Sequence, residues 1–159
     1  MGITYNRELA VEYAREWAYL RNPAYYNFDS LGGDCTNFVS QCLIAGGMPM
    51  NYQPIFGWYY VNLKTRSAAF TGVEYLYNFL TRQNKSRGPV AVILEIDKLL
   101  PGDIIQLSFD GTTFTHSLIV VEQGSDPLIA AHSHEAFGRA LSSYTFAAAR
   151  GLHILGAYS

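Results

Sequence analysis

Charged residues are scarce in this sequence of 159 amino acids, which contains 11 basic and 13 acidic residues. They make up 15% of the chain, whereas they account for about a quarter of a typical soluble domain. The net charge is −2 and the basic residues are scattered, so the chain lacks the concentrated positive charge that binds nucleic acid. We therefore expect no nucleic-acid partner.

Long uninterrupted apolar runs are also missing. No charged residue occurs between Asp34 and Lys64, but a membrane span needs about 20 mainly apolar residues. Polar and turn-forming residues break this segment at Asn37, Gln41, Gly46, Gly47, Pro49, Asn51, Gln53, Pro54 and Gly57. The first residues lead directly into a helical pattern without the apolar core of a signal peptide. The sequence predicts neither a membrane span nor a signal peptide, and the location stays open: a cell-wall substrate would put the domain in the cell envelope.

Only two cysteines are present, Cys35 and Cys42. If they share a helix, their spacing corresponds to about 10.5 Å along its axis, which exceeds the roughly 7 Å that a disulfide tolerates. The same separation prevents both from binding one zinc ion. His132 and His134 would share a strand face, but no nearby ligand completes a metal set. We therefore expect no metal and no organic cofactor.

The length favours one domain over residues 1–159, since about 100–200 residues is the usual size. Helical periodicity comes first along the chain and apolar strand patterns follow, which predicts an α+β domain with an antiparallel sheet. The expected helices are 6–20, one starting at Cys35 and ending at Gly46–Gly47, and 70–82. The expected strands are 90–96, 104–109, 114–122, 128–132 and 152–157, with an aromatic-rich loop over 48–64.

The first helix has an apolar stripe and a cap. Asn6 is the expected N-cap. The stripe comprises Leu9, Tyr13, Trp17 and Leu20, with Ala10, Ala14 and Ala18 beside it.

Cys35 is the residue most suggestive of chemistry. It follows Gly32-Gly33-Asp34 and opens a helix, where unpaired backbone N–H groups and the helix dipole favour a thiolate. The glycines would let a substrate backbone approach closely. The alternative is a cysteine packed on the apolar face of its helix, and we assign that structural role to Cys42.

A thiolate nucleophile usually needs a base, and His116 stands at the polar start of an apolar strand. His132 ends the next expected strand, and it would orient the ring of His116 if the two strands are neighbours. His134 follows in a loop, and His153 in the last strand is expected to be structural. A histidine satisfied inside a half-buried strand is the alternative for His116.

Further residues are candidates for shaping the site. Asp34 is a candidate helix cap, although its charge would oppose ionisation of a neighbouring thiol. The second oxyanion donor should come from upstream of Cys35, which points to Tyr25, Tyr26 and Asn27 or to ordinary loop residues at these positions. Trp58 is a candidate cleft wall, with a core position as the alternative.

The segment Gly-Gly-Asp-Cys-Thr-Asn-Phe-Val-Ser-Gln at 32–41 resembles the nucleophile segment of the NlpC/P60 and CHAP cysteine peptidase clan. Within that papain-like clan it is most similar to the bacterial group named "putative amidase domain". Other motifs of that group occur in order, so that the resemblance runs from Tyr5 to about Tyr144. These are Asn6-Arg7, Asn22-Pro23-Ala24-Tyr25, Gly57 to Tyr60, Pro101-Gly102-Asp103, and His116 to Val120.

The resemblance implies a papain-like fold in which a nucleophile helix packs on an antiparallel sheet. It also implies a triad of Cys35, His116 and a polar third residue, which points to His132, with His134 as the other possibility. Relatives cut amide bonds of bacterial cell-wall peptides. The implied partner is thus a peptide or amide substrate such as a peptidoglycan fragment; the oligomeric state is not indicated.

The sequence therefore predicts a cysteine amidase or peptidase. Cys35 would attack an amide carbonyl, His116 would protonate the leaving amine, and water would release the acyl group. An acyltransferase or transpeptidase would use the same triad with another acceptor. A non-catalytic peptide- or glycan-binding module would use the aromatic residues and would have no need of Cys35.

Overall fold

The computed structural model describes all residues from 1 to 159. Its main sheet has six antiparallel strands in the order β3-β8-β4-β5-β6-β7. The strands are β3 (Gly88–Leu94), β4 (Ile104–Ser108), β5 (Phe114–Glu122), β6 (Leu128–Ala131), β7 (Ala136–Ala140) and β8 (Ala148–Tyr158). The helices are α1 (Arg7–Trp17), α2 (Cys35–Ala45), α3 (Ala68–Thr71) and α4 (Val73–Leu80). The predicted α+β class with an antiparallel sheet is confirmed.

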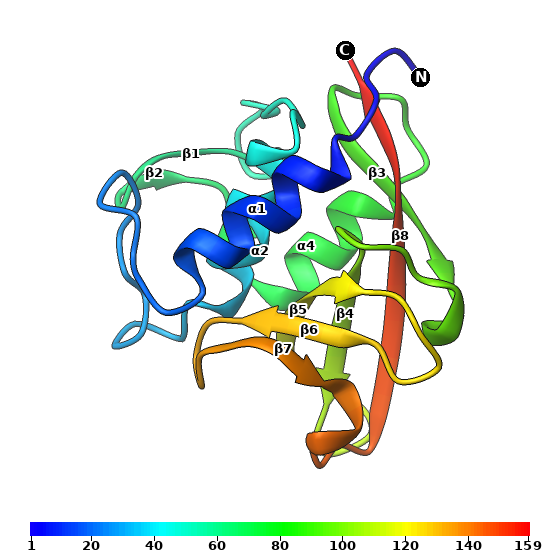
Figure 1. Cartoon of the computed structure of the whole chain (residues 1–159). Helices are drawn as coiled ribbons and strands as arrows, with labels where there is room; N and C mark the ends of the chain where they lie inside the picture. The colour runs from blue at the N-terminus through cyan, green and yellow to red at the C-terminus, as the bar shows by residue number, and fades with distance from the viewer.

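The helices gather on one side of the sheet, and the two ends of the chain lie together (Figure 1). A bridge between Ile3 and Ala157 joins the N-terminal segment to β8. Ile104 and Ile119 pack towards the helices, whereas Ile105 and Leu118 belong to a smaller core on the opposite face. Strand β4 is buried along its whole length and β5 from His116 to Val120, so apolar residues follow one another directly in parts of both strands.

Helix α2 is the centre of the helical layer. Every residue from Cys35 to Leu43 is buried, and the helix packs against α1 and β5. A helix enclosed on all sides has no position for an unpaired charge, which explains the absence of charge in this part of the sequence. No helix is long and apolar enough to span a membrane.

Helix α1 packs mainly through its small residues. Ala10, Ala14 and Ala18 are fully buried, whereas Leu9 and Leu20 are more than half exposed. The predicted stripe is therefore wrong at its two ends, while Tyr13 and Trp17 in its middle are partly buried against the core. The predicted cap is confirmed, because the side chain of Asn6 accepts a hydrogen bond from Leu9 N at 3.1 Å.

Other boundaries differ where the local pattern is weak. The single helix expected over 70–82 is split, since Gly72 adopts an extended conformation between α3 and α4. The expected loop over 48–64 ends in a two-stranded hairpin of β1 (Tyr60–Asn62) and β2 (Thr65–Arg66). Strand β7 is absent from the prediction. Short 3-10 turns occupy Ile96–Lys98 and Leu141–Ser143.

Candidate active site

The N-terminus of α2 presents Cys35 at the edge of strand β5. Gly32 and Gly33 have φ values of 88° and 98°, a conformation that side chains with a Cβ avoid, so they form the turn that leads into the helix. Cys35 is 7% exposed. The side chain of Thr36 lies 3.8 Å from its sulfur and 2.9 Å from the hydroxyl of Ser117 on β5, which fixes the helix start against this strand.

The thiol of Cys35 is not ionised by its position alone. Burial raises its pKa above the ordinary value, although hydrogen bonds from the backbone of Ser117 and from Thr36 act in the opposite direction. The expectation that the helix start favours a resting thiolate is therefore wrong, because desolvation outweighs it. A base is needed to remove the proton.

His116 stands near the start of β5 and is 7% exposed. No hydrogen bond joins its ring to another residue. Burial, together with the positive charges of His134 and Arg139, lowers its pKa from 6.5 to about 4. The imidazole is therefore neutral, and able to accept a proton, at neutral pH.

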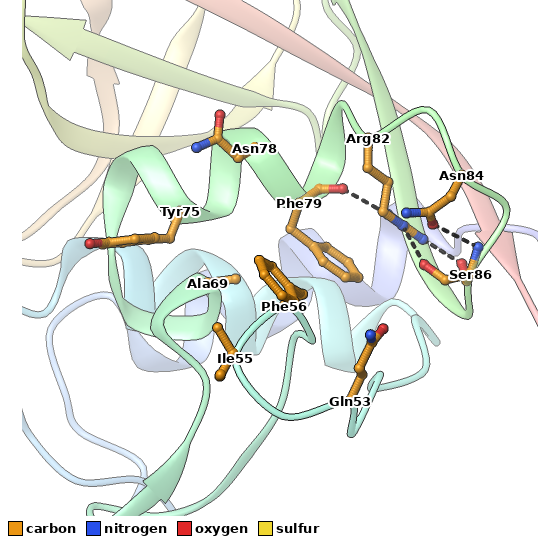
Figure 2. A pocket seen from close by; sticks show the side chains of 10 residues that line it. All are labelled: Gln53, Ile55, Phe56, Ala69, Tyr75, Asn78, Phe79, Arg82, Asn84 and Ser86. Atoms are coloured by element: carbon orange, nitrogen blue, oxygen red, sulfur yellow. Dashed lines mark hydrogen bonds between the residues drawn. The ribbon is translucent and has the colours of Figure 1, made fainter.

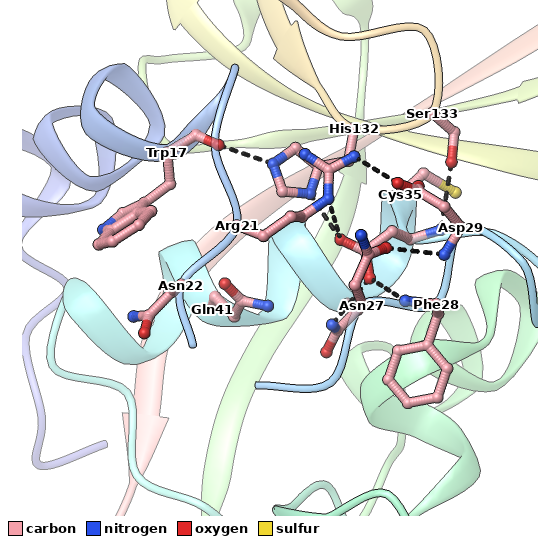
Figure 3. A network of polar contacts seen from close by, with 12 residues as sticks. Trp17, Arg21, Asn22, Asn27, Phe28, Asp29, Cys35, Gln41, His132 and Ser133 are labelled. Atoms are coloured by element: carbon pink, nitrogen blue, oxygen red, sulfur yellow. Dashed lines mark hydrogen bonds and ion pairs between the residues drawn. The ribbon is translucent and has the colours of Figure 1, made fainter. Parts of the chain in front are cut away.

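His132 is committed to other partners. Its Nε2 lies 2.7 Å from the carbonyl oxygen of Trp17 (Figure 3). Its Nδ1 lies 2.6 Å from Asp34 Oδ2, and its ring stacks on Phe38. Both ring nitrogens are therefore in hydrogen-bond contact with other groups. No nitrogen remains for His116. The expected contact between His132 and His116 is absent from this structure.

Asp34 organises the loop before the nucleophile helix. Its side chain does not cap α2; Oδ1 accepts hydrogen bonds from Phe28 N at 2.9 Å and from Asn37 Nδ2 at 3.0 Å. Burial would raise the pKa of Asp34, but the hydrogen bonds from His132, Phe28 and Asn37 prevail and keep it below its ordinary value. Asp34 is therefore a carboxylate in contact with the His132 ring, and it joins Phe28 in the loop to Asn37 in α2.

The upstream candidates make no hydrogen bond to Cys35. Tyr25 is half-buried and packs on Tyr60 and Phe70. The backbone N–H of Tyr26 donates a hydrogen bond to the Tyr60 hydroxyl, and its carbonyl oxygen accepts one from Asn37 Nδ2. The Asn27 side chain accepts a bond from Asp29 N. Their backbones belong to the ordered loop in front of α2, and no second oxyanion donor is evident among them.

Trp58 lies in the core and not on a cleft wall. It is fully buried, stacks near Phe70 and Phe79, and donates from Nε1 to Ser40 at 3.1 Å. The core alternative is therefore correct for this residue. The hydrogen bond from Trp58 to Ser40 joins this part of the loop to α2.

Two pockets of comparable size differ in chemistry. One of about 410 Å³ contains His116 and borders the loop after β6; its lining comprises Phe109, Thr115, His116, Ser133, His134, Arg139 and Tyr144. Ser133 Oγ accepts from Asp34 N at 3.1 Å, which ties this pocket to the nucleophile loop. A larger pocket of about 510 Å³ lies between α4 and the loop around Phe56 (Figure 2). Its one charged residue, Arg82, donates hydrogen bonds to the backbone carbonyl groups of Phe79, Ser86 and Pro89. Of these two pockets, the smaller one is therefore the one lined by histidine side chains.

The neighbouring side chains show what the two remaining histidines contact and whether the protein has a metal-ligand cluster. His153 Nδ1 lies 2.8 Å from Asp103, a buried carboxylate that also pairs with Arg7, so His153 is structural as expected. His134 is exposed on the rim of the smaller pocket. No group of three or more His, Cys, Asp or Glu side chains is close enough to hold a metal ion.

The structure is an α+β protein in which Cys35 opens a helix that packs beside the strand carrying His116. Residues 4–155 match the family model described as "Putative amidase domain", and the chain belongs to this family. It is 38% identical over 138 residues to "Uncharacterized protein YhbB" of Bacillus subtilis (strain 168), a match that covers 83% of this chain and 42% of that protein. The chain thus spans less than half of the relative's length. No solved structure matches. Family membership supports a general amidase or hydrolase role.

Sequence reasoning missed Thr36, Ser117, Arg139 and Tyr144. Thr36 and Ser117 directly follow the two predicted catalytic residues in the sequence, and that position could have identified them. No sequence signal identifies Arg139 and Tyr144, because they reach His116 only through the pairing of β7 with β6.

Proposed function

We propose that this domain is a cysteine-dependent amide hydrolase in which Cys35 is the nucleophile and His116 the base. One observation carries the proposal. The Thr36 side chain lies 3.8 Å from the sulfur of Cys35 and 2.9 Å from the hydroxyl of Ser117, which puts the sulfur beside β5, while the residue before Ser117, His116, lines a pocket.

The edge of β5 explains how these two side chains can meet. Neighbouring strand residues point to opposite faces, so the His116 ring leaves the sheet on the face away from α2. However, β5 pairs with β6 only from Ile119 to Glu122, so no neighbouring strand separates the two faces of β5 at His116 and Ser117. The proposal requires that the His116 ring and the Cys35 sulfur approach each other around this unpaired stretch.

The reaction proceeds from a neutral pair. As the sulfur of Cys35 attacks the amide carbonyl carbon, His116 takes the thiol proton, and the carbonyl oxygen becomes an oxyanion near the free N–H groups at the start of α2. His116 then gives the proton to the leaving nitrogen as the carbon–nitrogen bond breaks. Water attacks the thioester, His116 accepts its proton, and the sulfur recovers a proton as the acid departs.

His132 has a positioning role in this scheme, acting through Asp34 on the loop that precedes Cys35. His134, on the rim of the pocket, is the other ionisable ring beside His116. The fold relationship to the NlpC/P60 clan and a substrate of the cell-wall peptide type form part of the proposal, and both are supported by the motif at 32–41.

The test is a panel of peptidoglycan fragments and simple peptide amides, with amide cleavage followed by mass spectrometry. The proposal predicts that Cys35→Ala abolishes cleavage, whereas Cys42→Ala, which changes the cysteine in the core, retains it. Cleavage by Cys35→Ala at the wild-type rate would refute the proposal. Acyl transfer to an added amine in place of water would assign the same pair of residues to a transferase.

A further inference from the structure

The first turn of α2 is hydrogen-bonded both to strand β5 and to the segment that follows β6. Thr36 Oγ1 is 2.9 Å from the Ser117 hydroxyl on β5. The backbone N–H of Asp34 donates to Ser133 Oγ at 3.1 Å (Figure 3). Cys35 stands between Asp34 and Thr36 in the sequence, so Ser117 and Ser133 flank the turn that carries the proposed nucleophile.

Ser133 also lies beside the proposed base. Strands β5 and β6 are paired as far as Ile119 and Ala130, and the same register, continued, sets Ser133 opposite His116. Both residues line the pocket of about 410 Å³. Ser133 therefore connects the pocket of the base to the backbone of the nucleophile turn.

The side chain of Ser133 has an unused hydrogen-bond donor. A serine hydroxyl carries one donor and two acceptor lone pairs; the oxygen of Ser133 accepts from Asp34, and its O–H donates to no group of the protein. The N–H of Cys35 has no acceptor either, because it belongs to the first residue of α2. Asp34 has a ψ of 3°, at which successive amide nitrogens lie roughly 3 Å apart. An oxygen bound by the N–H of Cys35 is therefore close to Ser133 Oγ.

The turn that presents Ser133 is held in an unfavourable conformation. Ser133 and His134 have φ values of 58° and 69°, a region that residues with a Cβ rarely adopt. Such strain persists only where surrounding contacts impose it, and it is typical of functional sites. Here Asp34 bonds to Ser133, and Glu135 pairs with Arg21 at 3.3 Å. These contacts fix the hydroxyl before a substrate binds, as an oxyanion site requires.

We propose that Ser133 is a catalytic residue whose hydroxyl donates, together with the N–H of Cys35, to the carbonyl oxygen of the scissile amide. When the sulfur–carbon bond forms, the π electron pair of the carbonyl moves to this oxygen, and the two donors stabilise the charge. When the carbon–nitrogen bond breaks, the pair returns and His116 gives its proton to the leaving nitrogen. Ser133 keeps its own proton throughout. This inference rests on the proposed function and adds the second oxyanion donor that the loop before α2 lacks.

The test compares two reactions of Cys35, of which only one passes through an oxyanion. Para-nitrophenyl acetate acetylates the sulfur through a tetrahedral oxyanion and releases nitrophenolate, whereas iodoacetamide alkylates the sulfur by displacing iodide. Peptide mass spectrometry at pH 7 gives both rates at Cys35. Ser133→Ala should lower the ratio of acetylation to alkylation at least about tenfold, since the loss of one oxyanion donor costs about 10²–10³ in kcat. Ser133→Gly should lower it equally, because glycine accepts the positive φ and also lacks the hydroxyl.

Ser125→Ala is the matched control, because it removes a hydroxyl from an exposed turn between β5 and β6 and should leave both rates unchanged. If neither reagent modifies Cys35, the proposed function fails. If both reagents modify Cys35 and Ser133→Ala leaves their ratio unchanged, the oxyanion role of Ser133 alone fails. A ratio that falls in Ser133→Ala but not in Ser133→Gly would also overturn that role, since the cause would then be the backbone and not the hydroxyl.

Discussion

Acidification should destabilise the wild-type protein more than a His116→Asn variant. The ring of His116 is held neutral in the folded state, with a pKa of about 4 against 6.5 for the free side chain. Above pH 6.5 the ring is neutral in both the folded and the unfolded chain and contributes nothing. As the pH falls towards 4, the unfolded chain takes up a proton and the folded chain does not, so the free energy of unfolding decreases.

The magnitude follows from the two pKa values. The complete shift corresponds to roughly 3 kcal/mol, at 1.36 kcal/mol per unit, and about 2 kcal/mol of it should already be lost at pH 5. Residual contact of the ring with solvent makes these upper values. The asparagine variant has no proton to gain at this position, so its free energy of unfolding lacks this component.

Urea unfolding of both proteins between pH 8 and pH 5, followed by tryptophan fluorescence, measures the effect. Other titrating groups are common to both proteins and cancel in the difference. The free energy of wild type minus that of His116→Asn should fall by about 2 kcal/mol over this range. A constant difference would refute a neutral buried imidazole, and a difference that rises on acidification would show that folding raises the pKa of His116 instead of lowering it.

Two further substitutions test the loop structure around the site. Asp34→Ala removes the carboxylate from the buried His132 ring and should cost about 3–5 kcal/mol of unfolding free energy; thermal unfolding at the wild-type temperature would contradict the buried ion pair. Gly57→Ala would put a Cβ 2.3 Å from the carbonyl oxygen of Asn51 and should cost about 1–3 kcal/mol. Gly124→Ala, whose nearest neighbour would be 3.8 Å away, should be neutral, and equal stability of the two glycine variants would contradict the tight packing at Gly57.

Much of the fold was predictable where the local pattern is strong. Strand β5 and the start of α2 are confirmed at the expected residues, because an apolar run with a polar start and a Gly-Gly-Asp turn are unambiguous signals. Strand β7 was missed since its residues are few, half-exposed and interrupted by Gly138. The packing face of α1 was misjudged because hydrophobicity favours Leu9, whereas the close approach of α1 to α2 requires alanine.

The candidate site was predictable only in part. A sequence identifies Cys35 and a histidine-bearing strand, but it does not show which ring nitrogens are occupied. His132 looked suited to orient His116, yet Trp17 and Asp34, both distant in sequence, take its two nitrogens. Ionisation of Cys35 was overestimated for a related reason, since desolvation depends on the whole helical layer around α2.

The most direct test of the proposed cysteine–histidine pair is the alkylation rate of Cys35 at pH 7, measured with iodoacetamide and peptide mass spectrometry. Cys42 in the same chain is the internal reference, because it is fully buried. If His116 removes the thiol proton, His116→Ala should slow alkylation of Cys35 at least about tenfold, with Cys42 unaffected. Equal rates at Cys35 in wild type and His116→Ala would contradict the proposed pair.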